Sequence, residues 1–427
     1  MLCGMRLPFV NRTAELRELD SAARRGGLLV VYGRRRVGKS RLLRHWLQGR
    51  DGLYSQAIEA SPDTQLEQVF QDVRGQLGTR ITPKTWAEML EILALQNRRW
   101  TLCLDEFPYL VAADPSLPSR LQKWLDPSMP AGCLLILAGS STRMMHDLFL
   151  HRAAPLYGRA HKLLRIQPLD YESFCRACDQ EVDAAESFEK FACVGGIPKY
   201  WEFVEAGQDV VALAESLYFD FAPYMEQEPQ RILRDEGVVG LNALAVLEAV
   251  GRGAERPSEI ATRLGTAQTS LSRLLRQLLD ASILRRELPF GESLRSTRKV
   301  LYRIHDPSLR FWFRVYSPHR SLWRTYAASE KRKLIHDHAS TVFEDFCRAR
   351  FPGAQRHWEA DVELDLVAPD PSDRKSLLVA EVKWRRVSRS ERKRILRQLE
   401  EKWSRCSLRG SHPRVRFELF DTTSLVA

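Results

Sequence analysis

The feature that most constrains this chain is an eight-residue loop near its N-terminus. Residues 33–40 read Gly-Arg-Arg-Arg-Val-Gly-Lys-Ser, which fits the spacing G-x-x-x-x-G-K-[ST]. An apolar run at 28–32 precedes the loop, and an amphipathic run at 41–47 follows it. Backbone N–H groups of such a loop wrap around a phosphate chain, and the N-terminus of the next helix attracts its charge. The motif therefore predicts an α/β fold built around a nucleotide-binding loop.

The loop also predicts roles for single residues. We expect Lys39 to place its charge on the β- and γ-phosphates, and the Ser40 hydroxyl to ligate Mg²⁺. The three arginines at 34–36 occupy variable positions of the motif and face either solvent or an inter-domain surface. The residues expected to contact the nucleotide in this segment are Gly33, Val37, Gly38, Lys39, Ser40 and Arg41.

Short apolar runs alternate with helical patterns over the first 168 residues, which predicts a parallel sheet covered on both faces. The expected strands are 28–32, 53–57, 100–104, 134–138 and 161–166. Two carboxylates, Asp105 and Glu106, follow the third strand. We expect Asp105 to hold Mg²⁺ and Glu106 to orient the attacking water. The fourth strand ends in Ser140 and Ser141, either of which could sense the γ-phosphate.

These segments together resemble a known family. The stretches 9–16, 32–40, 104–110 and 138–141 are similar to those of the archaeal-type ATPases, which belong to the STAND class of AAA+-like P-loop NTPases. Residues 155–159 and 195–200 add two further matches, and the resemblance covers about residues 1–235. It implies an ATPase core at 1–168, a helical lid at 169–235, and ATP with Mg²⁺ as cofactors.

The resemblance also implies further site residues. Asn11 and Arg12 would lie near the adenine or ribose, and Gly196 and Pro198 would position the lid against the base. Arg159 would stabilise charge near the γ-phosphate, with an ordinary salt bridge as the alternative.

Residues 236–325 contain the pattern of a winged helix-turn-helix. Three short helices are expected at 241–250, 257–265 and 269–280, and a basic wing at 285–303 carries Arg295, Arg298 and Lys299. Such a domain can place polar and basic side chains in the major groove of DNA. It can also serve as a protein-docking unit, and the sequence leaves both interpretations open.

Residues 326–427 carry a second cluster of chemically capable residues. Glu344 lies in an expected helix, Asp365 in a strand at 362–367, and Glu381 and Lys383 in a strand at 377–384. Residues two apart in a strand share a face, so Glu381 and Lys383 point together. The set resembles the PD-(D/E)XK nucleases, which implies a restriction-endonuclease-like α/β fold with Asp365 and Glu381 on a divalent metal. An inert nuclease fold is the alternative.

The net charge of +11 favours a polyanionic partner. We therefore predict an ATP- and Mg²⁺-dependent switch coupled to DNA binding, with metal-dependent cleavage by the C-terminal domain. The alternatives are a nucleotide-gated DNA-binding regulator and a STAND signalling scaffold. No apolar run is long enough to span a membrane, and the eight dispersed cysteines favour a reduced, cytoplasmic protein. A nucleotide-dependent homo-oligomer is left open.

Overall fold

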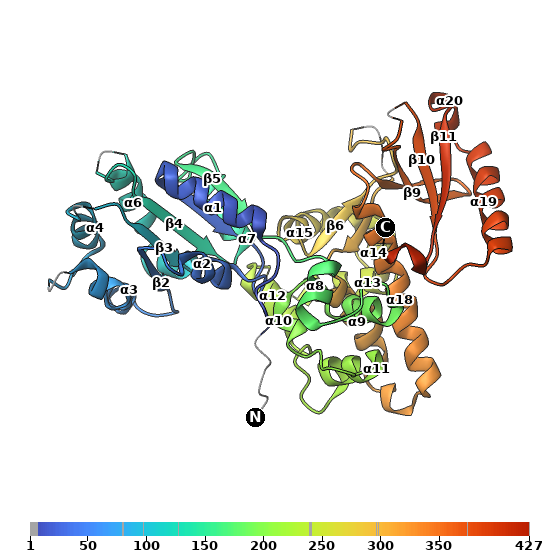
Figure 1. Cartoon of the computed structure of the whole chain (residues 1–427), viewed down its shortest axis with the longest axis horizontal. Coiled ribbons are helices and arrows are strands. Elements are labelled where there is room, and N and C mark those ends of the chain that lie inside the picture. Colours follow the sequence, from blue (N-terminus) through green and yellow to red (C-terminus); the bar gives the residue numbers. More distant parts are fainter. Residues whose placement is uncertain are drawn as a thin grey trace.

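The structure is a computed structural model that describes residues 7–426, except 79–80, 97, 127, 239–240, 296, 298 and 374. The expected wing residue Arg298 therefore lies outside the described residues. Figure 1 shows a sheet at each end of the molecule and a largely helical part between them. Among the described residues, no helix combines the length and apolar character needed to cross a bilayer.

The N-terminal sheet has five parallel strands in the order β2-β3-β4-β1-β5. All five predicted strands are confirmed, each displaced by no more than one residue at either end. Because β3 and β4 are neighbours, the segments that follow them meet at one edge of the sheet. The strands are β1 (Gly27–Tyr32), β2 (Gly52–Gln56), β3 (Thr101–Asp105), β4 (Leu134–Gly139) and β5 (Ala160–Arg165).

Helices cover both faces of this sheet, as the buried strands require. Within β1, Leu28 and Val30 belong to the core on one face, and Leu29 and Val31 belong to the core on the other. The helices are α1 (Thr13–Arg25), α2 (Lys39–Leu47), α3 (Pro62–Leu77), α4 (Trp86–Ala94), α5 (Phe107–Ala113), α6 (Leu117–Leu125) and α7 (Thr142–Phe149).

The middle of the molecule is a helical region followed by a helix-turn-helix. The first part comprises α8 (Tyr171–Cys178), α9 (Ala185–Val194), α10 (Pro198–Trp201), α11 (Val210–Ala214) and α12 (Glu228–Asp235). The second comprises α13 (Leu241–Gly251), α14 (Pro257–Arg263), α15 (Gln268–Asp280) and an antiparallel hairpin of β6 (Leu284–Glu287) and β7 (Leu301–Ile304). The three helices fall where the sequence predicts them. The short helices α16 (Pro307–Phe311) and α17 (Ser317–His319) lead to the last part.

The C-terminal part has the element order helix, three strands, two helices, strand. Its sheet runs β11-β10-β9-β8, with β8, β9 and β10 antiparallel and β11 parallel to β10. Its long first helix packs against α9 and α11 of the helical region, so the two parts share one core. The elements are α18 (Ala328–Ala349), β8 (Gln355–Glu359), β9 (Val362–Pro369), β10 (Leu377–Val382), α19 (Arg389–Ser404), α20 (Leu408–Ser411) and β11 (Val415–Phe420).

Candidate nucleotide, nucleic-acid and metal sites

The loop between β1 and α2 has the backbone of a phosphate cradle. Gly33 has a φ of +152°, and a Cβ there would collide with the carbonyl oxygen of Ile166. Gly38 has a φ of +96° and precedes the first turn of α2. Both positions therefore need glycine, because larger residues disfavour these angles or lack the space. The N-terminus of α2 opens at Lys39 and Ser40, as the motif predicts.

Lys39 is buried and closes onto its own loop. Its Nζ donates to the carbonyl oxygens of Gly33 at 2.9 Å and Arg34 at 3.2 Å, and to Oγ of Ser140 at 2.9 Å. Burial lowers the pKa of Lys39, and the nearby carboxylates of Glu106 and Asp105 oppose that shift. A phosphate group would give this ammonium a stronger, charged partner than the two carbonyl oxygens.

Asp105 and Glu106 lie beside Lys39 and have different hydrogen-bond partners. Asp105 is fully buried, and its carboxylate accepts from Oη of Tyr54 at 2.7 Å and from the backbone N–H of Glu106 at 2.9 Å. Glu106 has a φ of +55° and accepts from Oγ of Ser140 at 2.5 Å. Ser140 thus lies between the lysine and the second carboxylate.

The two serines after β4 have different hydrogen-bond partners. The hydroxyl of Ser141 accepts from the backbone N–H of Met144 at 3.2 Å and so caps α7. The hydroxyl of Ser140 contacts both Lys39 and Glu106. Of the two residues that the sequence left open, Ser140 is the one beside Lys39 and Glu106, and its role as a γ-phosphate sensor stays a prediction.

An apolar pocket lies next to the loop, in the region where the resemblance predicts the base. Arg12 and Asn11 brace this region: Nη2 of Arg12 donates to the carbonyl oxygen of Val37 at 2.9 Å, and Nδ2 of Asn11 donates to Oγ of Ser173 at 3.0 Å. Gly196 passes so close to the backbone of Leu169 that no Cβ fits. The pocket is lined by Leu7, Pro8, Phe9, Val10, Arg12, Val37, Gly38, Arg41, Leu169, Ala177, Pro198 and Trp201.

Arg159 forms a salt bridge with a residue outside the phosphate loop. Its Nη2 contacts Oδ2 of Asp126 at 2.8 Å, and its Nη1 donates to the carbonyl oxygen of Pro155 at 3.1 Å. The pair is partly exposed, and Asp126 follows α6 rather than the loop. In this conformation Arg159 has the salt bridge that was the alternative, so a role near the γ-phosphate stays a prediction.

The three loop arginines each meet a carboxylate from outside the ATPase core. Arg34 pairs with Asp306 at 3.0 Å, and both side chains are largely buried. Arg35 pairs with Asp235 at 3.0 Å in a more exposed contact. Arg36 pairs with Glu228 and stacks on the ring of Tyr224, 4.9 Å from its centroid. Of the two settings that the sequence allowed, the inter-domain surface is the one observed.

Helix α12 supplies two of these three acids, and the residue after it contacts α7, which follows Ser140 and Ser141. Glu236, directly after α12, accepts from the backbone N–H of Arg143 at 3.3 Å, in the first turn of α7. Burial raises the pKa of Glu236 to about 7, although Arg143, Arg34 and Thr142 oppose that shift. A cavity of about 760 Å³ lies between α12 and the carboxylate of Glu106, with Arg35 and Ser140 in its wall.

The C-terminal sheet brings together the residues predicted there. Oδ2 of Asp365 on β9 accepts from the backbone N–H of Val382 at 2.9 Å. Glu381 on β10 accepts from Nζ of Lys383 at 2.8 Å and from Nζ of Lys402 on α19 at 3.0 Å. The sequence did not predict a role for Lys402. Its helix has many basic residues, and nothing in its distance along the chain from Glu381 marks it as a partner.

The charges in this cluster act on one another. Burial raises the pKa of Asp365 to about 7, and the carboxylates of Glu381 and Glu344 add to the rise. The pKa of Glu381 is lowered by its two lysines, against the effect of burial. Glu344 on α18 lies 3.6 Å from Nη1 of Arg348, which also donates to the carbonyl oxygen of Asp365 at 2.8 Å. We refer to Glu344, Asp365, Glu381, Lys383 and Lys402 as the Asp365 cluster.

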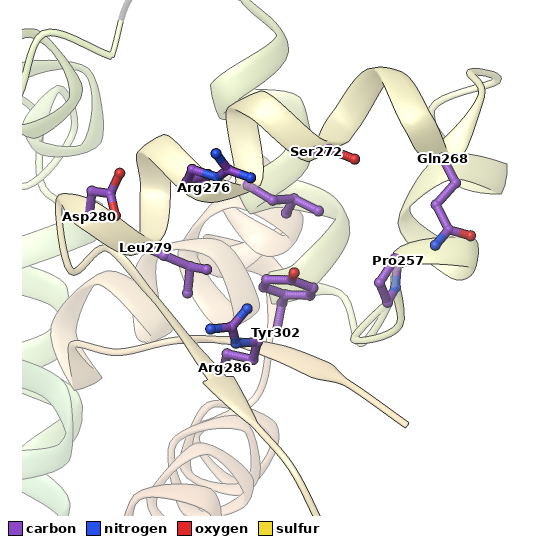
Figure 2. Close-up of a pocket in the computed structure, with 9 residues that line it drawn as sticks. Pro257, Gln268, Ser272, Arg276, Leu279, Asp280, Arg286 and Tyr302 are labelled. Atoms are coloured by element: carbon purple, nitrogen blue, oxygen red, sulfur yellow. The ribbon is translucent and has the colours of Figure 1, made fainter. Parts of the chain in front are cut away.

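The helix-turn-helix carries a polar notch between its third helix and its hairpin. Figure 2 shows Arg286 and Tyr302 of the hairpin beneath α15, which presents Ser272 and Arg276. The notch has a volume of about 380 Å³, and Gln268 lies near its other end.

Two other hairpin arginines are taken up by ion pairs. Arg285 contacts Asp345 of α18, and Nε of Arg303 lies 2.7 Å from Oε1 of Glu255. The backbone N–H of Phe290, in the expected wing, donates to the carbonyl oxygen of Arg356 on β8 at 2.9 Å. The hairpin is thereby joined to the C-terminal part.

Three protein families match this chain. Residues 9–204 match an ATPase domain predominantly from Archaea, residues 241–288 match the IclR helix-turn-helix domain, and residues 312–395 match archaeal and bacterial proteins of unknown function. An uncharacterised protein of Methanocaldococcus jannaschii, MJECL04, is 26% identical over 92% of this chain and 91% of its own length.

Solved structures are similar to this chain. The Walker-type ATPase PABY2304 of Pyrococcus abyssi is 20% identical, with a TM-score of 0.54 over 74% of this chain and 100% of its own. The ORC2 protein of Aeropyrum pernix is 13% identical, with a TM-score of 0.46 over 80% of this chain and 97% of its own. The chain therefore contains an archaeal-type ATPase domain with a parallel P-loop sheet, followed by a helix-turn-helix of the IclR type.

Proposed function

We propose that the protein is an ATP-hydrolysing switch whose nucleotide state is transmitted to a DNA-binding winged helix. The observation that carries this proposal is the contact between Arg34 and Asp306. Arg34 lies inside the phosphate loop, and Asp306 follows β7 of the hairpin by two residues and caps α16. A loop that moves on binding phosphate would pull directly on the end of the hairpin.

Hydrolysis would use the hydrogen bonds that link Lys39, Ser140 and Glu106. Lys39 would leave its carbonyl partners for the β- and γ-phosphates, and the Ser140 hydroxyl would turn toward the γ-phosphate. The Glu106 carboxylate, now free of Ser140, would accept a hydrogen bond from the attacking water and hold it in line. Each step uses a group that already lies within hydrogen-bond distance of the next.

Ser40 and Asp105 fit a magnesium ion. A hydroxyl and a carboxylate are oxygen donors, which this hard cation prefers. Both carboxylate oxygens of Asp105 already accept hydrogen bonds, from Tyr54 and from the backbone of Glu106, which fits a contact to the ion through water. Bound there, Mg²⁺ would neutralise charge on the phosphates.

The proposed DNA contact is the notch between α15 and the hairpin. Exposed Arg276 and Arg286 would meet backbone phosphates, and Gln268 and Ser272 would face the groove. We expect Arg276→Ala to weaken duplex binding and to reduce the slope of log K against log salt by about 1. Arg74→Ala, an exposed arginine on α3, is the matched control. Equal salt slopes for both variants in fluorescence anisotropy would contradict this interface.

A second candidate function is DNA cleavage by the C-terminal part. The order α18-β8-β9-β10-α19-α20-β11, with Asp365 on the second strand and Glu381 near the end of the third, supports the nuclease-like fold that the resemblance implies. Burial raises the pKa of Asp365, and the carboxylates of Glu381 and Glu344 raise it further because they disfavour its negative charge. A divalent cation between Asp365 and Glu381 would relieve that repulsion, and the oxygen donors suit Mg²⁺ or Mn²⁺. Lys383 and Lys402 would then be free to contact a phosphate.

We expect the full-length protein to nick supercoiled plasmid in the presence of Mn²⁺ or Mg²⁺. Asp365→Asn should reduce the rate by at least about 100-fold, because it removes the charge of a metal ligand. Asp361→Asn is the matched control, since that carboxylate is exposed in the turn before β9. If wild type and Asp365→Asn cut alike, or neither cuts, the inert nuclease fold is favoured and the switch proposal stands alone.

A further inference from the structure

We propose that His357, Glu359 and Cys406 form a binding site for a thiophilic divalent cation, with Zn²⁺ as the best match. The site uses none of the residues of the Asp365 cluster and does not depend on the proposed function. His357 and Glu359 lie two residues apart on β8, so their side chains share a face of the strand. Cys406 follows the end of α19 and reaches the same place from the other side of the C-terminal part.

The spacing of the three donors suits one ion. One ligand atom from each residue lies within 4.8 Å of the other two. Nε2 of His357 and Oε2 of Glu359 are 3.7 Å apart. In a tetrahedral zinc site with bonds of about 2.0–2.3 Å, ligand atoms are separated by about 3.3–3.8 Å. The histidine–carboxylate edge therefore already has the length that zinc requires, and the thiol needs only a small movement.

The imidazole ring of His357 is buried and has no hydrogen-bond partner. Its side chain is 5% exposed, and neither ring nitrogen makes a hydrogen bond. A buried polar group without a partner is costly and rare in folded proteins. A metal ion would supply the missing partner.

The other two donors are also prepared for an ion. The Cys406 side chain is buried and carries a free thiol. The Glu359 carboxylate accepts from the backbone N–H and the hydroxyl of Ser407, which fix its orientation. Such outer contacts are typical of metal ligands.

Three protein donors leave a fourth position for water, and imidazole with thiolate favours zinc over magnesium or calcium. Bound there, the ion would connect β8 to the segment after α19.

Cobalt substitution tests this site directly. Co²⁺ titrated into the full-length, reduced protein should give one equivalent of thiolate-to-cobalt charge-transfer absorption, which Zn²⁺ then displaces. Cys406→Ser should abolish that band. Cys178→Ser is the matched control: Cys178 is also a buried free cysteine but lies outside this site, so the cobalt band should be unchanged in that variant.

Two results would overturn the proposal: no charge-transfer band in the wild type, or a band that survives Cys406→Ser. Glu359→Gln guards against a misfolded cysteine variant, since it keeps the thiol. It should retain the thiolate band and weaken cobalt binding by about 10-fold or more. An unchanged affinity in this variant would also count against the site. The readout requires neither ATP turnover nor DNA cleavage, so its failure would leave those proposals untouched.

Discussion

Glu106→Gln is expected to reduce ATP turnover by about 100- to 10,000-fold and to leave ATP binding nearly unchanged. The amide keeps the size of the side chain and can still contact Ser140, but it no longer polarises a water molecule. Lys39→Ala should lose both turnover and affinity, because the buried ammonium is the charge that meets the phosphates. Steady-state phosphate release and binding of a fluorescent ATP analogue separate the two effects.

The two serines at the end of β4 provide the matched comparison for this prediction. Ser140→Ala removes the group between Lys39 and Glu106, and we expect turnover to fall by about tenfold or more. Ser141→Ala removes only a helix cap and should cost about 1 kcal/mol of stability with little effect on turnover. Equal turnover in the wild type and in Glu106→Gln would contradict the assignment of Glu106.

The parts of the site that the sequence predicted are those set by local pattern. A strand, a glycine-rich loop and a helix fix Lys39 and Ser40 within a few residues, and the strand before Asp105 places it at the same sheet edge. The parallel sheet follows from alternating elements for the same reason. The helix-turn-helix was predictable because its helices are short, amphipathic and bounded by turn residues.

The partners that come from distant segments could not be predicted. Tyr54, which donates to Asp105, is an ordinary tyrosine in a buried strand until β2 is placed beside β3. Lys402 reaches Glu381 only because α19 packs against β10. The acids that meet the loop arginines lie about 190 to 270 residues away in the chain, and no spacing rule connects them.

The loop arginines also show why an unassigned motif position can matter. In a phosphate loop the variable residues are free to differ, so three consecutive arginines carry no predicted role. In the structure each has its own carboxylate, and two of the three acids belong to α12. The loop is therefore held against α12 and Asp306 by charge, and a triphosphate entering it would bring competing negative charge to the same arginines.

Arg34→Met is expected to lower the free energy of unfolding by about 3–5 kcal/mol, because it leaves the Asp306 carboxylate buried without its cation. Both side chains are nearly inaccessible, with exposed fractions of 12% for Arg34 and 2% for Asp306. Arg35→Met is the matched control from the same loop. Its side chain is 51% exposed, so its pair with Asp235 should contribute no more than about 1 kcal/mol. Chemical denaturation of both variants measures the difference.

A double-mutant cycle then separates the ion pair from its surroundings. Asp306→Asn keeps the oxygen that caps α16 and loses the charge that faces Arg34, so Arg34→Met with Asp306→Asn should be more stable than the sum of the single changes predicts.

The same variants also test how the nucleotide state affects DNA binding. If Arg34 transmits the nucleotide state, ATP should change the affinity of the wild type for duplex DNA and have less effect on either single variant. If the stability changes are additive and ATP still changes the DNA affinity of the single variants, the Arg34–Asp306 pair does not link the phosphate loop to DNA binding. A coupling energy without an ATP effect would limit the pair to a structural role, because a pair that only stabilises the fold contributes equally in both nucleotide states.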